Sequence, residues 1–121
     1  MYCWRAIAGY SAFGSYTGNA SGDGPYIHLG FQPRLVIFKN TATTNGWRMM
    51  DTRDSYIPNN PTKFGVYPHT NDQEDSPDNW KTDFFSNGIK ILDNNNELNG
   101  SGNKIIYAAW ADQPFKTARA I

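Results

Sequence analysis

The sequence predicts an all-β fold: an antiparallel, jelly-roll-like β-sandwich with one long irregular loop, forming a single domain over residues 1–121. Two observations carry this prediction. First, 15% of the residues are aromatic and they are interspersed with 11 Gly and 7 Pro, which is typical of many short strands joined by turns. Second, the run Leu35-Val36-Ile37-Phe38 is apolar at every position. A strand that is apolar on both faces lies inside a sheet or between layers, which in a chain this short indicates a two-layer architecture.

Glycine, proline and asparagine divide the first half of the chain into strands. The segment from Tyr10 to Thr17 alternates and ends in a glycine-rich loop. Pro33 has a fixed φ and no amide hydrogen, so sheet pairing of the next strand is expected from Arg34 onwards. Asn45-Gly46 then predicts a hairpin. The predicted strands of this half are residues 10–17, 26–29, 34–40 and 47–50.

The second half begins with a long polar stretch from Asp54 to Thr82, which contains four prolines and an acidic run. A loop of this length in a compact domain is usually functional or holds short elements of its own. Asn87-Gly88 predicts a second hairpin, between strands at 83–85 and 88–92. The last predicted strand covers 103–111.

Alternation on these strands also predicts the apolar core. We expect the core to comprise Phe13, Leu35, Ile37, Phe38, Trp47, Phe84, Ile89, Ile91, Ile106 and Trp110.

Composition argues against several functional classes. The formal net charge is zero, so the chain lacks the basic excess with which nucleic-acid-binding proteins neutralise phosphates. The longest apolar runs are far shorter than the roughly 20 residues of a membrane-spanning helix. No basic segment followed by an apolar one opens the chain, so no signal peptide is expected. Cys3 is the single cysteine and has no partner for an internal disulfide.

The sequence predicts no catalytic residue, no cofactor and no metal ligand set. His28 and His69 stand far apart, and neither has a second ligand two to four residues away. The run from Asp93 begins like a calcium loop, but Leu98 replaces the turn glycine and Lys104 the closing carboxylate. A weaker calcium site remains open as an alternative to a solvated acidic loop; its residues would be Asp72, Glu74, Asp75 and Asp78.

Several turn-plus-strand motifs occur in an order that resembles small β-rich domains of tailed-bacteriophage virion structural proteins. The leading motif is Gly30-Phe31-Gln32-Pro33, followed by the apolar run and Lys39-Asn40. The others are residues 14–19, 23–26, 51–54, 83–90 and 99–110. The resemblance implies a tail-fibre, head-fibre or capsid-decoration role, a location in the virion and a homo-oligomer, with a trimer favoured by fibre architecture. Residues 2–6 echo residues 108–111, which indicates either a terminal repeat unit or chance similarity.

Surface recognition is the function that these observations favour. Aromatic side chains on loops are suited to docking sugars or proteins, and the candidate contact residues are Tyr56, Tyr67, His69 and Trp80. We expect a non-enzymatic virion protein that contacts other phage proteins or a host surface glycan or receptor. A free carbohydrate-binding module is the alternative, and a small hydrolase is disfavoured because no acid and base pair is evident.

Overall fold

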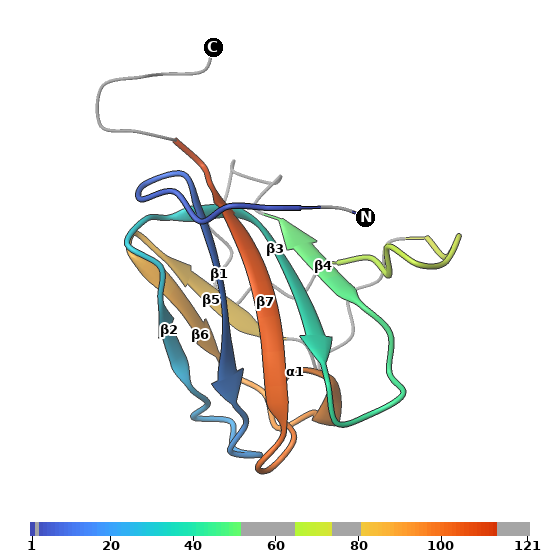
Figure 1. Cartoon of the computed structure of the whole chain (residues 1–121). Helices are drawn as coiled ribbons and strands as arrows, with labels where there is room; N and C mark the ends of the chain where they lie inside the picture. The colour runs from blue at the N-terminus through green and yellow to red at the C-terminus, as the bar shows by residue number, and fades with distance from the viewer. Residues whose placement is uncertain (2, 52–64, 74–80, 114–121) are drawn as a thin grey trace.

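Two antiparallel sheets face each other in the computed structural model, which describes residues 1, 3–51, 65–73 and 81–113. The four-stranded sheet has the order β1-β7-β3-β4 and the three-stranded sheet the order β2-β6-β5 (Figure 1). The larger sheet contains β1 (Ser11–Thr17), β3 (Pro33–Asn40), β4 (Arg48–Asp51) and β7 (Lys104–Ala111). The smaller contains β2 (Tyr26–His28), β5 (Thr82–Phe85) and β6 (Gly88–Ile91). The predicted all-β sandwich is therefore confirmed.

The described residues form seven strands, whereas a jelly roll has eight. The jelly-roll detail thus stays a prediction. Both predicted hairpins are present, because β3 pairs with β4 and β5 pairs with β6. The one helix among the described residues, α1 (Asn96–Asn99), was not expected from the sequence; the Asn95 side chain caps it by accepting a hydrogen bond from the Glu97 amide.

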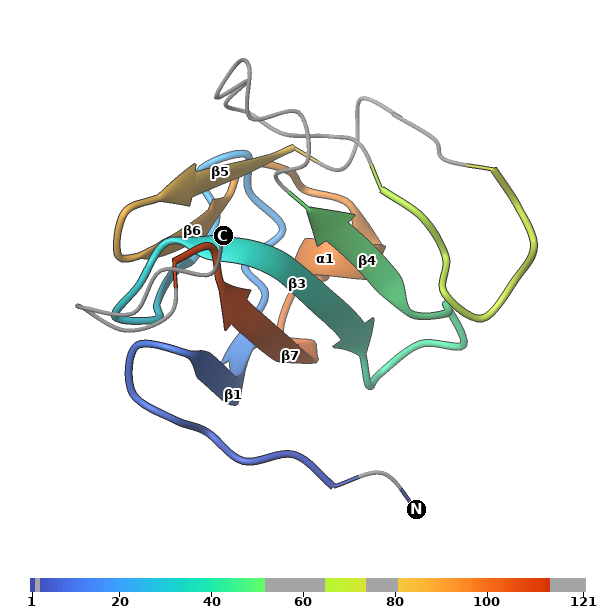
Figure 2. The ribbon, with the colours of Figure 1, turned by 90° about the horizontal axis from the view of Figure 1, so that it is seen from above.

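The two sheets face each other in the view along the strands (Figure 2), and the residues of the core lie between them. From β3 it takes Val36 and Phe38, both with 0% exposure, and not Leu35 and Ile37, which are half-buried on the other face. The predicted core is confirmed for Phe38, Phe84, Ile89 and Ile91. It is wrong for Trp47, which is exposed, and for a half-buried set on the outer face of the four-stranded sheet: Phe13, Leu35, Ile37, Ile106 and Trp110.

A buried amide joins the loop after β1 to α1. The Asn99 side chain is fully buried, and its amide nitrogen donates to Asn19 Oδ1, to the carbonyl of Ser21 and to the carbonyl of Asp93 at 2.7 to 2.9 Å. Its oxygen accepts from the Asn19 amide at 2.8 Å. Since a buried amide without such partners is costly, these bonds fix the end of the sandwich at which α1 lies.

The residues before β1 form an arm, residues 3–7, that crosses the outer face of the four-stranded sheet. In Figures 1 and 2 the arm passes β7 and β3 on the side away from β5 and β6. Ser11, which is buried, holds the arm: its hydroxyl donates to the Arg5 carbonyl at 2.8 Å and accepts from the Ile7 amide at 3.2 Å. Residues 3–6 form no strand, so the structure does not reproduce the strand-like echo of residues 108–111.

Most of the predicted long loop lies outside the described residues. Within residues 65–73, Val66 forms a β-bridge with Met49 and thereby holds this segment against the edge strand β4. This bridge brings the following residues, Tyr67 to His69, to the margin of the four-stranded sheet.

Candidate functional site

An apolar groove of about 730 Å³ is open on the outer face of the four-stranded sheet. We call it the aromatic groove. Its floor and walls come from the arm, three strands, the end of the β3–β4 connection and the segment after Val66. The lining residues are Trp4, Phe13, Gly14, Ile37, Trp47, Pro68, His69, Ile106, Tyr107, Ala108 and Trp110.

The groove follows from the registers of β1, β7 and β3. Ala108 of β7 stands directly between Phe13 of β1 and Ile37 of β3. Side chains at directly paired positions lie on the same face, and here the middle one is only a methyl group. The larger neighbours therefore rise on either side of Ala108 and leave a hollow above it.

An aromatic cluster forms one wall. The ring centroid of Trp4, on the arm, lies 6.5 Å from that of Phe13, in a stacked arrangement. It lies 5.4 Å from that of Trp110, in an edge-to-face arrangement. The Phe13 and Trp110 rings are also perpendicular to each other, with 5.7 Å between their centroids. Edge-to-face aromatic contacts of this kind add stability beyond burial alone. They position Trp4 on the sheet although its side chain remains 66% exposed.

Trp47, Pro68 and His69 form the opposite wall. His69 lies against the backbone at Gly46, where a Cβ atom would overlap the imidazole ring. Glycine at position 46 therefore permits the close approach of the two segments that carry Trp47 and His69.

Tyr67 supports this wall from behind without lining the groove. Its ring is packed against the core and meets His69 edge to face with 5.6 Å between centroids. Its hydroxyl donates to the Glu97 carboxylate on α1, at 3.0 Å. The buried Arg48 guanidinium lies 5.2 Å from the ring centroid, which is within the range of a cation–π contact.

The chemistry available in the aromatic groove is that of apolar contact. Its lining side chains include no carboxylate, carboxamide, ammonium or guanidinium group. The polar side-chain groups that its lining residues present on this face are the indole N–H groups and the His69 imidazole. Tyr107 stands directly between Gly14 and Phe38, so its side chain lies on the inner face of the sheet, against the core, where burial raises the pKa of its hydroxyl. The groove lacks a paired nucleophile and base and is suited to binding an apolar surface.

The structure describes two of the four predicted contact residues. His69 lines the aromatic groove, and Tyr67 lies behind it. Tyr56 and Trp80 lie outside the described residues. Sequence reasoning assigned Phe13, Ile37, Ile106 and Trp110 to the core and so missed them as surface residues. Trp4 was not among the predicted contact residues. The sequence did contain a signal for this surface, because β3 is apolar on both faces. The second sheet covers only one of these faces, so the other is left as an apolar surface.

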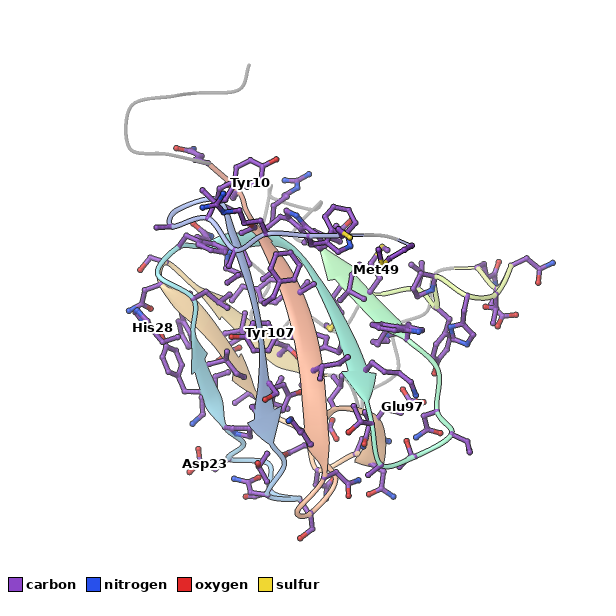
Figure 3. The ribbon with its side chains drawn as sticks, viewed as in Figure 1. Tyr10, Asp23, His28, Met49, Glu97 and Tyr107 are labelled. Atoms are coloured by element: carbon purple, nitrogen blue, oxygen red, sulfur yellow. The ribbon has the colours of Figure 1, made fainter. Side chains whose placement is uncertain are left out.

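The outer face of the three-stranded sheet has a different character. Tyr26 and Phe85 are exposed, with ring centroids 6.2 Å apart, and the Tyr26 hydroxyl donates to Asn87 Oδ1 at 2.6 Å. Lys90 forms an ion pair with Asp23 at 2.7 Å. Figure 3 shows His28 and Asp23 on this side of the molecule and Met49 and Tyr107 on the four-stranded sheet. Charged and polar groups thus interrupt this face, and it contributes nothing to the aromatic groove.

Among the residues that the structure describes, no three His, Cys, Asp or Glu side chains gather in a way that could hold a metal ion. Three residues of the alternative calcium site, Glu74, Asp75 and Asp78, lie outside the described residues. No helix in the described ranges is both long and apolar enough to cross a membrane.

Fold and groove together define a small all-β sandwich domain with an aromatic surface on one sheet. The chain belongs to the DUF7483 family, a domain of unknown function, whose sequence profile matches residues 1–114. No curated protein and no solved structure matches the chain.

Proposed function

We propose that this protein is a non-enzymatic structural component of a bacteriophage virion that binds its partner through the aromatic groove. The observation that carries the binding role is the groove itself: about 730 Å³ of apolar hollow on the exposed face of a rigid sheet. The ordered turn-plus-strand motifs that resemble phage tail-fibre, head-fibre and decoration domains support the location in a virion.

Two properties of the groove favour recognition by contact. Its volume falls within the range of about 300 to 1,000 Å³ of ordinary ligand pockets, which are also mostly apolar. Both of its walls carry tryptophan, the residue most enriched among those that dominate binding energy at protein interfaces. Trp4 and Trp47 are exposed, so a partner that covers them removes apolar surface from water.

A protein partner fits the groove better than a sugar does. Sugars present apolar ring faces to aromatic side chains, but their hydroxyl groups also need hydrogen-bonding partners when water is removed. The lining residues offer no carboxylate or carboxamide for that purpose. The free carbohydrate-binding module is therefore the weaker of the two functions, and another virion protein is the favoured occupant over a host glycan.

The experiment compares two double variants in assembled particles. Trp47→Ala with His69→Ala removes one wall of the groove; Tyr26→Ala with Phe85→Ala removes a similar aromatic pair from the opposite sheet. Incorporation into particles, measured by quantitative mass spectrometry, and adsorption to cells should fall for the first variant and stay at the wild-type level for the second. Equal behaviour of the two variants would show that the groove is not the contact surface. Absence of the wild-type protein from particles would exclude the virion role.

A further inference from the structure

The outer face of the four-stranded sheet carries both a projection and a hollow. The projection is Trp4, whose side chain is 66% exposed on the arm. The hollow is the part of the aromatic groove above Ala108, between Phe13 and Ile37. Both belong to the same surface, since Trp4 itself forms one wall of the groove.

We propose, on the basis of the contact role given above to this groove, that its occupant is a second copy of this chain. The two copies pack sheet face to sheet face about a two-fold axis, and the Trp4 side chain of each enters the aromatic groove of the other. The arm is thus a connecting element of the assembly as well as a wall of the groove.

The charge of the surface suits contact with itself. In a two-fold interface each patch meets its own copy, so any charged group near the axis faces a like charge. The groove has no Asp, Glu, Lys or Arg among its lining residues, and the whole chain has a formal net charge of zero. Lys39 and Asp51 share this outer face by register but lie outside the groove lining, so a two-fold axis through the groove brings no charged lining residue against its own copy. On the outer face of the three-stranded sheet, by contrast, Lys90 and Asp23 would each need an opposite charge from the second copy.

The shape of the surface favours a closed pair over the trimer expected from fibre architecture. A ring of three needs two different surfaces on each subunit, one for each neighbour. Here the projection and the hollow lie on the same sheet face. A single second copy can cover that face, and no second contact surface is then needed. Facing sheets also pack well when their inner side chains interdigitate.

The size of the face is compatible with a modest but specific interface. Four strands spaced about 4.8 Å apart, with an average length near seven residues, project over roughly 400 Å². The arm and the segment with Pro68 and His69 extend this area beyond the strands. A standard interface buries about 800 Å² of accessible surface on each partner, and accessible area exceeds projected area because side chains are rugged.

The test is sedimentation velocity combined with light scattering on the full chain over a range of concentrations. The wild type should reach twice the 13.6 kDa of one chain in a concentration-dependent manner. Ala108→Arg places a charge in the floor of the groove and should keep the protein monomeric with an unchanged far-ultraviolet circular dichroism spectrum. Trp4→Ala removes the contact from both copies, so two good aromatic contacts are lost per pair and association should weaken about a hundredfold, tenfold for each. Phe85→Arg introduces the same charge on the opposite sheet and should leave association as in the wild type.

Four outcomes would overturn the inference: a wild-type monomer at the highest soluble concentration, a mass of three chains, an Ala108→Arg variant that associates normally, or dissociation by Phe85→Arg alone. Failure here is distinct from failure of the proposed function. A monomeric wild type whose incorporation into particles still requires Trp47 and His69 would leave the virion role standing with a different protein in the groove. Self-association without any presence in particles would leave the pair standing without the virion role.

Discussion

The ring of Trp4 meets the ring of Trp110 edge to face, with 5.4 Å between the centroids. This contact joins the start of the described chain to its last strand, and it turns the arm into a wall of the aromatic groove. The arm depends on Ser11 for its position, because that hydroxyl bonds to both Arg5 and Ile7. If the arm were released, the groove would therefore lose one of its walls.

Replacement of Ser11 by Ala should loosen the arm around Arg5, while the backbone bridge between Ile7 and residue 11 remains. The variant loses two hydrogen bonds at a buried site, and we expect it to cost about 1 kcal/mol of stability. Trypsin should cleave after Arg5 faster than in the wild type, which a time course followed by mass spectrometry measures. Ser15→Ala, at an exposed position of the same strand, is the matched control. Equal cleavage rates in all three proteins would show that Ser11 does not hold the arm.

Adjacent residues of β3 should differ sharply in their contribution to stability. Phe38 is fully buried between the sheets, so Phe38→Ala should cost about 3 to 5 kcal/mol. Ile37 is half-buried on the outer face, so Ile37→Ala should cost only about 1 kcal/mol. Urea denaturation of dilute protein, in which self-association does not contribute, measures both. A loss at Ile37 as large as that at Phe38 would mean that the face we describe as open is a second core.

The buried Asn99 amide should be required for stability. Asn99→Ala leaves the Asn19 amide and the Asp93 carbonyl without their partner, and we expect a loss of about 2 to 3 kcal/mol. Asn94→Ala, at a nearby exposed position, should change stability by no more than about 0.5 kcal/mol. Thermal denaturation of the two variants compares them directly, and similar melting temperatures would argue against a structural role for the Asn99 network.

Asp83 should destabilise the fold at neutral pH. Burial raises the pKa of this carboxyl above its ordinary value of 3.8, an effect that the charge of Lys90 partly offsets. Its Oδ1 atom is shielded from solvent and accepts no hydrogen bond from the described residues. A raised pKa in the folded state means that stability is lost as the pH rises through that pKa. Asp83→Asn should therefore have a higher Tm than the wild type at pH 7.

The difference between Asp83→Asn and the wild type should shrink as the pH falls and vanish below 3.8, where the carboxyl is protonated in both states. Asp23→Asn is the control, for which we expect a change in stability in the opposite direction. The hydrogen bond and the charge of Lys90 lower the pKa of Asp23, so its removal should reduce stability at pH 7. A Tm difference for Asp83→Asn that is the same at every pH would contradict the assignment.

Periodicity and turn residues were enough to predict the strands, because most strand ends here lie at or close to Gly, Pro or Asn. They were not enough to predict which face of β3 is the core. Leu35 and Ile37 are as apolar as Val36 and Phe38, so the pattern carries no sign that distinguishes the two faces. The position of the second sheet decides between them, and that depends on contacts between distant segments.

The aromatic groove was hidden from sequence reasoning for a related reason. Its lining combines Trp4, Ile37, His69 and Trp110, which are far apart in the chain and become neighbours only through the registers of β1, β7 and β3. Aromatic residues in the long loop pointed to His69, because loop aromatics are common at contact surfaces. Aromatic residues on predicted strands, such as Trp47 and Trp110, were assigned to the core, since alternation alone favours burial.

Cryo-electron microscopy of purified particles tests most directly whether the aromatic groove is the contact surface of a virion protein. We expect density for this β-sandwich in the particle, with the outer face of the four-stranded sheet covered by a neighbouring subunit and the Trp4 side chain buried in the contact. Particles without this density, or a particle in which the face bearing Phe13, Ile37 and Ala108 is open to solvent, would contradict it.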